Sequence, residues 1–355
     1  MGDKVLMKGN EAIGEAAIKA GCQCFFGYPI TPQTEISAYL SRRMPKIGRV
    51  FLQAESEIAA INMVYGCAGT GVRCMTSSSS PGISLKSEGI SYIAGAELPC
   101  VIINIVRGGP GLGGIQPAQS DYFQATKASG HGDFNMPVYA PASIQEMADL
   151  IQDAFDVAEI YRTPVMIMGD GMLGQMMEPI EFKERVKREL PEKTWAANGL
   201  KGRKAHNVIN SLYLKPEELE DHNNHLQNKY KAIKENETKY ELFNCDREND
   251  LVVVAYGTTS RICKNVIKMA EKDGIKLGLI RPITLWPYPV EAFEKTMDST
   301  KGYISVELSC GQMVEDVRLA VNGRKPVHFF GRTGGMVPNP EEILEKVKEI
   351  VGGDK

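Results

Sequence analysis

Short apolar segments alternate with segments of helical spacing along the first half of the chain. Residues 22–26, 72–75 and 101–106 are apolar runs with the length of buried strands. Residues 10–20 and 143–159 instead repeat apolar positions every three or four residues, as amphipathic helices do. Strands and helices that alternate in this way predict a parallel sheet covered by helices on both faces, an α/β fold.

The same alternation returns near the C-terminal end. Residues 251–256, 275–280 and 303–307 read as strands separated by helical segments. The stretch between the two regions is rich in Lys, Glu, Asn and His and poor in apolar residues. A chain of 355 residues exceeds the usual size of one compact domain. We therefore expect an α/β domain over residues 1–178, a charged helical connector over 179–249 and a smaller α/β domain over 250–355.

Composition excludes several classes of function. The net charge of −3 gives no reason to expect nucleic acid or a membrane surface as a partner. The 8 cysteines among 355 residues are too sparse for a disulfide scaffold. None of them forms a C-x-x-C pair, so zinc-ribbon and ferredoxin-type ligand spacing are absent. The first residues lack a long apolar run. We expect a cytoplasmic protein without a signal peptide or membrane span.

One strand–helix junction, residues 51–69, has an unusual composition. Ser56 is a good N-cap, because its hydroxyl can accept a hydrogen bond from a free N–H of the first turn. Small residues fill much of the helix that follows, which permits close approach of a backbone or a flat ligand. Two acids, Glu55 and Glu57, stand where this helix begins. They could complement the helix dipole or belong to a site, and the junction alone leaves both interpretations open.

Two glycine motifs match known sites only superficially. Residues 109–114 fit G-x-G-x-x-G, but Pro110 interrupts the motif and Pro117 prevents the helix that a dinucleotide site needs. Residues 169–171, with Asn198 downstream, resemble an Asp and Asn pair that holds Mg²⁺ on a diphosphate. A highly charged run separates the two halves of this motif, where apolar sheet segments are expected. We assign no metal to this chain.

Two further features follow predicted strands. The serines at 77–80 lie between a strand and a helix and could bind an anion or simply cap the helix. Arg107 ends an apolar strand, and glycines after it leave its guanidinium accessible. A planar guanidinium suits a carboxylate ligand, although a structural ion pair explains the position equally well.

Four segments in this order resemble a known family. They are G-Y-P-I-T-P at 27–32, the acidic junction at 53–66, Arg107 with Q-S-D at 119–121, and R-P-I-T-L-W-P-Y-P at 281–289. Together they resemble the α subunit of the 2-oxoacid:ferredoxin oxidoreductases over nearly the whole chain. The resemblance implies that residues 1–178 form the pyrimidine-binding domain of a thiamin diphosphate enzyme. Residues 250–355 would resemble the C-terminal domain of transketolase.

The resemblance also implies roles for individual residues. The family's catalytic glutamate, which contacts N1′ of the cofactor's aminopyrimidine ring and promotes loss of the C2 proton, corresponds to Glu57 rather than Glu55. Thr31 and Arg107 correspond to the residues that bind the 2-oxoacid, Arg107 at its carboxylate. The residues expected to contact the cofactor are Tyr28, Pro29, Ile30 and Glu57.

The implied reaction is the oxidative decarboxylation of a 2-oxoacid to acyl-CoA and CO₂, with electrons passed to ferredoxin. A β subunit would share the thiamin diphosphate and carry its Mg²⁺. Iron–sulfur clusters would lie on partner subunits, among them small iron–sulfur and γ-type subunits, and CoA would be a co-substrate. The pattern looks most like the branched-chain members that use 2-oxoisovalerate. The alternatives are a 2-oxoglutarate:ferredoxin oxidoreductase α subunit and a non-catalytic structural subunit on the same fold.

Overall fold

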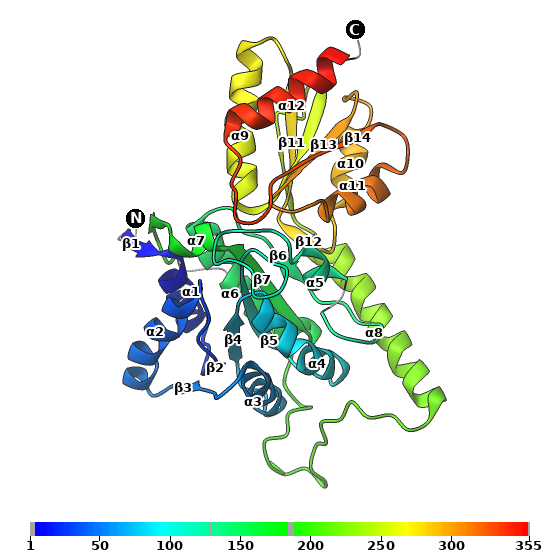
Figure 1. The fold of residues 1–355 in the computed structure, drawn as a ribbon. Coiled ribbons are helices and arrows are strands. Elements are labelled where there is room, and N and C mark those ends of the chain that lie inside the picture. Colours follow the sequence, from blue (N-terminus) through cyan, green and yellow to red (C-terminus); the bar gives the residue numbers. More distant parts are fainter. Residues whose placement is uncertain (1–3, 128, 184–187, 354–355) are drawn as a thin grey trace.

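The chain forms two α/β units that lie one above the other (Figure 1). The computed structural model describes residues 4–127, 129–183 and 188–353. The larger unit is built around a 7-stranded sheet and contains most of the first half of the chain. A smaller unit follows it. Parallel strands and covering helices in both units confirm the predicted α/β fold class.

The larger unit alternates strands with helices, and among the strands of its sheet only β12 (Thr284–Trp286) comes from far along the chain. Its sheet has the strand order β12-β6-β7-β5-β4-β2-β3, and every pair in it is parallel except β12 with β6. β1 and β8 form a separate antiparallel pair. The elements are β1 (Val5–Lys8), α1 (Gly9–Lys19), β2 (Cys24–Gly27), α2 (Thr34–Arg43), the 3-10 helix η1 (Pro45–Ile47), β3 (Val50–Gln53), α3 (Glu57–Gly69), β4 (Cys74–Ser78), α4 (Pro81–Gly95), β5 (Cys100–Val106), α5 (Tyr122–Thr126), β6 (Val138–Tyr139), α6 (Ile144–Tyr161), β7 (Pro164–Asp170), α7 (Gly171–Gln175) and β8 (Met177–Ile180).

The strands of the larger sheet are apolar because helices cover both faces. In the fully buried β5, Val101 and Ile103 face the cluster formed by α1, α2 and α6. Ile102 and Val106 face the opposite cluster, which contains α3 and α4. This alternation explains why the strand reads as a continuous apolar run rather than an apolar–polar repeat.

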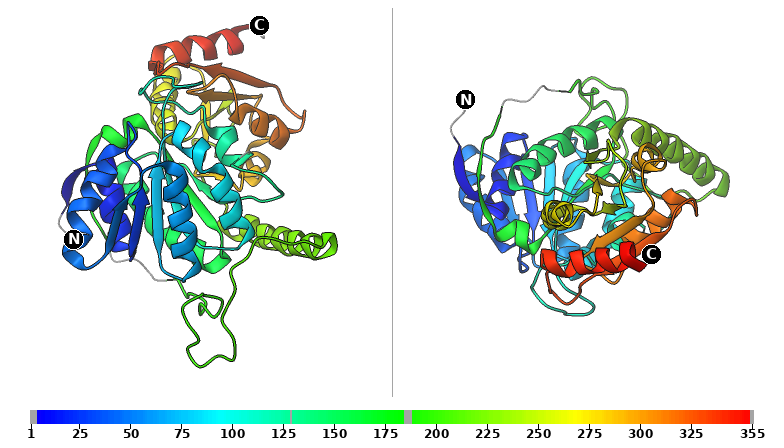
Figure 2. Two further views of the ribbon diagram at one scale, coloured as in Figure 1. Left: turned by 60° about the horizontal axis from the view of Figure 1, so that its bottom comes forward. Right: turned by 90° about the horizontal axis from the view of Figure 1, so that it is seen from above.

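The predicted connector is partly a loop and partly one long helix. The described residues 188–215 hold no helix or strand, and part of this loop projects from the larger unit (Figure 2). Ala196 is nevertheless buried, and the Ala197 N–H donates to the Gly69 carbonyl of α3 at 2.9 Å. α8 (Pro216–Glu237) follows, and its buried residues pack into the core around α4. β9 (Tyr240–Phe243) then joins the smaller sheet. We keep the division at 178/179 and 249/250 as a proposal. No helix in the described ranges combines the length and apolar character needed to span a bilayer.

The smaller unit is a second, mostly parallel sheet. Its strand order is β14-β13-β10-β11-β9, with only β9 antiparallel to its neighbour. α9 and α12 cover one face, as Figure 1 shows. The elements are β10 (Leu251–Val254), α9 (Gly257–Lys272), β11 (Leu277–Pro282), β12 (Thr284–Trp286), α10 (Val290–Thr296), β13 (Tyr303–Glu307), α11 (Met313–Val321), β14 (Val327–Gly331) and α12 (Pro340–Gly353).

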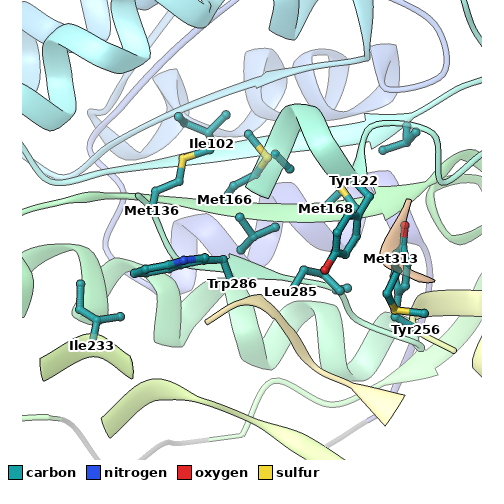
Figure 3. Close-up of a cluster of buried hydrophobic side chains, with 14 of the residues drawn as sticks. Ile102, Tyr122, Met136, Met166, Met168, Ile233, Tyr256, Leu285, Trp286 and Met313 are labelled. Atoms are coloured by element: carbon teal, nitrogen blue, oxygen red, sulfur yellow. The ribbon is translucent and has the colours of Figure 1, made fainter. Parts of the chain in front are cut away.

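One apolar core joins the two units. β12 leaves the smaller unit and pairs with β6 at the edge of the larger sheet. Figure 3 shows Tyr122 and Met168 of the larger unit in the same cluster as Tyr256, Leu285 and Met313. The loops after β5 and β7 are therefore held against the smaller unit.

Arg281, at the end of β11, ties three elements together. Its Nη1 and Nη2 each donate to the carboxylate of Glu146 on α6, both at 2.9 Å. Its Nε donates to Glu241 on β9 at 2.7 Å. The arginine side chain is almost fully buried, so these charge-assisted bonds compensate for its lost hydration.

Replacing Arg281 with leucine should destabilise the protein strongly. The change leaves two partly buried carboxylates without their cation, and we expect a loss of about 3 kcal/mol in the free energy of unfolding. Arg324, whose guanidinium pairs with Glu294 at the surface, is the matched control. Urea denaturation of R281L, R324L and the parent chain measures both effects. An R281L midpoint equal to that of R324L would contradict the structural role of Arg281.

Candidate active site

Four loops meet at one edge of the larger sheet. β5, β4, β2 and β3 are adjacent and parallel, so their carboxyl ends lie side by side. The segments that follow them are residues 28–33, 54–56, 79–80 and 107–121. Ligands of open parallel sheets bind at this edge. The structure thus brings the segments at 27–32, 53–66, 77–80 and 107–121 into one region. The segment at 281–289 instead runs from the end of β11 through β12.

Glu57 is the first residue of α3 and is buried. Ser56 caps this helix, since its hydroxyl accepts from the Ala59 N–H at 3.1 Å, which confirms the predicted N-cap. The Glu57 side chain is only 6% exposed, whereas Glu55 lies at the surface. No hydrogen bond to the Glu57 carboxylate is found among the described residues. An uncompensated buried carboxylate is costly, which makes it a candidate for a ligand contact.

The first turn of α4 comes unusually close to Glu57. A Cβ atom placed on Gly82 would lie 2.8 Å from Glu57 Oε1 and 2.0 Å from Ser78 Oγ. Two turns later, a Cβ on Gly89 would lie 2.6 Å from Ile61 of α3. Only glycine permits this packing of the two helices. The buried hydroxyls of Ser78 and Ser79 have no hydrogen-bond partner within the described residues.

Lys86 is a site residue that the sequence interpretation missed. It lies on α4 between the two glycines and is fully buried. Its Nζ donates to Thr76 Oγ1 on β4 at 2.9 Å. Burial lowers the pKa of Lys86 to about 8, and the nearby Glu57 carboxylate opposes this shift. The sequence signal was its position four residues after one glycine and three before the other, on the helix face that meets α3.

Arg107 and Thr31 lie together. Arg107 Nη1 donates to the Thr31 carbonyl oxygen at 2.9 Å, and Nη2 donates to the Leu112 carbonyl at 3.2 Å. The buried Nε has no hydrogen-bond partner in the described ranges. The Thr31 side chain is exposed. The guanidinium therefore joins the loop after β2 to the loop after β5, while its Nε–H stays available for another acceptor.

The loop with Tyr28, Pro29 and Ile30 is half-buried and anchored by a glutamine. Gln33 Nε2 donates to the Tyr28 carbonyl at 3.3 Å, and Gln33 Oε1 accepts from Ser77 Oγ at 2.6 Å. This pair of bonds joins the loop after β2 to the end of β4. It sets the half-buried loop beside the serine segment.

A buried acid organises the loops after β4 and β5. Asp121 accepts from Ser80 Oγ at 2.7 Å and from Asn104 Nδ2 at 3.0 Å. Burial raises the pKa of Asp121 above its usual value, although both donors and the charge of Arg107 oppose the shift. Ser80 has a φ of 24°, in a region that non-glycine residues rarely adopt. Such strain is common at functional sites and persists where hydrogen bonds hold the backbone.

The two glycine motifs have structural roles. Residues 109–114 lie in an exposed loop closed by a hydrogen bond from Gly114 N–H to the Gly108 carbonyl at 2.9 Å. Asp170 is the N-cap of α7, where it accepts from the Leu173 N–H at 3.0 Å, and it also accepts from the Thr258 hydroxyl. In the described part of the chain, no group of three or more His, Cys, Asp or Glu residues is placed to hold a metal ion.

Comparison with known proteins identifies the family. The family model described as "Pyruvate flavodoxin/ferredoxin oxidoreductase, thiamine diP-bdg" matches residues 15–242. The chain belongs to this oxidoreductase family. A second model of the family, "Pyruvate:ferredoxin oxidoreductase core domain II", matches residues 249–343. The resemblance drawn from the sequence segments is thereby confirmed.

Relatives within the family are similar over almost their full length. The ketoisovalerate oxidoreductase subunit VorB of Methanothermobacter marburgensis is 49% identical over 98% of both chains. The 2-oxoglutarate synthase subunit KorA of Archaeoglobus fulgidus is 35% identical over 98% of this chain and 99% of its own.

Solved structures show the same fold. The 2-oxoglutarate:ferredoxin oxidoreductase from Magnetococcus marinus, solved with 2-oxoglutarate, coenzyme A and succinyl-CoA bound, superposes with a TM-score of 0.87 and 26% identity. The match covers 99% of this chain and 66% of that chain. A split-gene transketolase, at 13% identity and a TM-score of 0.58, shares the fold alone.

Gly82→Ala should damage the site and the fold together. The added methyl group would clash with Ser78 Oγ and push the Glu57 carboxylate aside, and overpacking of this kind costs about 1–3 kcal/mol. Gly66 on α3 is the matched control, because a Cβ there meets nothing within 4 Å. Gly66→Ala should raise stability by up to about 1 kcal/mol through helix propensity. Chemical denaturation measures the free energy of unfolding of both variants. Equal values for Gly82→Ala and Gly66→Ala would contradict the close contact at Gly82.

Proposed function

We propose that this chain is the α subunit of a thiamin diphosphate-dependent 2-oxoacid:ferredoxin oxidoreductase that acts on a branched-chain 2-oxoacid such as 2-oxoisovalerate. The observation that carries the proposal is the buried Glu57 carboxylate. It has no hydrogen-bond partner among the described residues, and it lies within the segment matched by the thiamin diphosphate-binding family model.

The residues around Glu57 fit the aminopyrimidine end of the cofactor. Its carboxylate and the unpaired hydroxyls of Ser78 and Ser79 offer hydrogen-bonding groups at the same edge of the sheet. Together with Tyr28, Pro29 and Ile30, Glu57 would hold the ring. Thiamin diphosphate, when bound, supplies the carbon nucleophile that adds to the 2-oxo group. Glu57 would hold and transfer the proton at N1′ of the ring.

Arg107 and its surroundings suit a substrate with one carboxylate and an apolar side chain. The unused Nε of Arg107 would face the substrate carboxylate, and Thr31 would hydrogen-bond the same molecule. The segments 28–33 and 108–121 beside Arg107 contain no further Lys or Arg for a second carboxylate. Leu112 and Ile115 are instead exposed there, at 85% and 56%. This favours a branched-chain 2-oxoacid over 2-oxoglutarate, in line with the higher identity to VorB than to KorA.

Other parts of the enzyme would come from partner subunits. The Asp170 carboxylate is already engaged in capping α7 and in an interdomain contact, so we place Mg²⁺ and the diphosphate on a β subunit. Small iron–sulfur and γ-type subunits would carry the clusters that pass electrons to ferredoxin, and CoA would accept the acyl group. The exposed apolar residues around Glu57 support docking of a subunit at this edge; they are Leu52, Ile58 and Leu85.

Glu57→Gln should abolish most activity, while Glu55→Gln should not. An amide cannot accept and return the N1′ proton, and loss of such acid–base catalysis lowers kcat on the order of 100-fold or more. Glu55 is two residues away but exposed, which makes it a matched control. The assay is 2-oxoisovalerate-dependent CO₂ release by the co-purified α–β complex. Full activity of E57Q would contradict the assignment, and so would an inactive E55Q.

Arg107→Met should raise the KM for the 2-oxoacid by on the order of 10–100-fold, since a hydrogen bond to a charged partner is lost. Thiamin diphosphate affinity should change little. Arg332→Met is the control, because that guanidinium pairs with Glu342 in the smaller unit. Initial-rate kinetics with 2-oxoisovalerate and titration with thiamin diphosphate separate the two effects. An unchanged KM would make Arg107 purely structural.

A further inference from the structure

Lys86 occupies a position in which a lysine is rarely found. It lies at the interface of α3 and α4 and is fully buried, although lysine is almost never buried unless it is paired. Within the described residues, its ammonium makes a single hydrogen bond, to the neutral hydroxyl of Thr76 at 2.9 Å. An ammonium has three donors to satisfy. One neutral acceptor does not compensate for removing this charge from water.

Glu57 is the opposite charge that faces Lys86. The two residues come from neighbouring helices that meet at Gly82, one turn before Lys86 on α4, where a Cβ atom would lie 2.8 Å from Glu57 Oε1. No direct ion pair joins the two side chains among the described residues, so the Glu57 charge acts on the ammonium across the interface. Glu57 is itself buried and lacks a hydrogen bond among the described residues. Each group therefore has a charge that the other can compensate.

Other charged groups near α4 are engaged elsewhere. Glu88, on the same helix, is exposed and accepts from the Tyr92 hydroxyl. Asp121, after β5, accepts from Ser80 and Asn104 and faces Arg107. Asp170, at the end of β7, caps α7 and accepts from the Thr258 hydroxyl. β4, which carries Thr76, contributes no carboxylate or cationic side chain. Among these acids, Glu57 is therefore the one buried at the interface with Lys86 and not engaged by another described side chain.

We propose that Lys86 is a positioning residue for Glu57: its ammonium, oriented by Thr76, is the counter-charge that faces the buried carboxylate across the α3–α4 interface and keeps it turned toward the edge of the sheet. The charge pairing is inferred from the burial of both groups at the α3–α4 interface and does not depend on the cofactor. Its catalytic consequence rests on the proposed function of Glu57. An adjacent positive charge stabilises a carboxylate, so it would bias the proton shared by Glu57 and a ring nitrogen toward the nitrogen.

The protonation of Lys86 is consistent with this role. Its pKa of about 8 leaves the amine mainly protonated at neutral pH. The ammonium can therefore act as a fixed positive charge during the reaction. The contacts at Gly82 and Gly89 hold the backbones of α3 and α4 close together, so both groups lie in the same narrow interface.

A double-mutant cycle on the full chain, without cofactor or partner, tests the pairing. Lys86→Met alone should lower the folded-to-unfolded ratio about 100-fold or more, because it leaves a buried carboxylate without a cation. In an E57Q background, Lys86→Met should lower the folded-to-unfolded ratio by a factor at least tenfold smaller, because residue 57 is then a neutral amide. The exposed Lys268→Met on α9 should change neither background. Additive losses for K86M and E57Q would overturn the pairing.

The pH dependence of the assembled enzyme tests the positioning role. In K86M the acid limb of kcat/KM should move to higher pH by about 1 unit or more, because a carboxylate without a neighbouring cation binds a proton more readily. Thr76→Val removes only the orienting hydroxyl and should shift the acid limb in the same direction by a smaller amount. This variant replaces K86M in the test if K86M folds poorly. An acid limb unchanged in both variants would overturn the role. Full activity of E57Q would instead refute the proposed function while leaving the cycle intact.

Discussion

Where α3 packs against α4, the absence of a side chain at Gly82 lets the helix backbone approach the Glu57 carboxylate. A methyl group at that position would come within 2.8 Å of Glu57 Oε1 and 2.0 Å of Ser78 Oγ. The Glu57 carboxylate at the N-terminus of α3 and Lys86 on α4 are both buried where these two helices meet. Burying charge is expensive, so such an arrangement persists only where the charges compensate one another or a ligand. The close helix contact at Gly82 and the proposed pairing of Glu57 with Lys86 therefore depend on each other.

The smaller unit fixes the other side of the same region. Gln119 in the loop after β5 donates to the Tyr256 carbonyl at 3.0 Å, and its Oε1 accepts from the Leu308 N–H at 3.0 Å. Arg107 lies in the same loop, so its position depends on both units. The pairing of β12 with β6 and the hydrogen bonds of Arg281 keep the two units together. The smaller unit thus helps to determine the geometry of the loop that carries Arg107.

Local patterns in the sequence predicted the α/β fold class and the N-cap at Ser56, because strand length, helical spacing and capping chemistry depend on neighbouring residues. Burial of Glu57 but not Glu55 could not be read from the junction, since it depends on how closely α4 approaches. Lys86 was missed for the same reason: in sequence it reads as an ordinary polar position of a helix. The pairing of β12 with β6 joins residues far apart in the chain and leaves no local signal. The roles of Glu57, Thr31, Arg107 and residues 28–30 remain predictions.

The most direct test of the account is a structure of the assembled enzyme with thiamin diphosphate bound. The quantity to measure is the distance from the Glu57 carboxylate to N1′ of the aminopyrimidine ring. The account predicts a hydrogen bond of about 2.6–3.2 Å, with the Lys86 ammonium on the far side of the carboxylate. A ring that contacts Glu55, or that binds at another edge of the sheet, would contradict it.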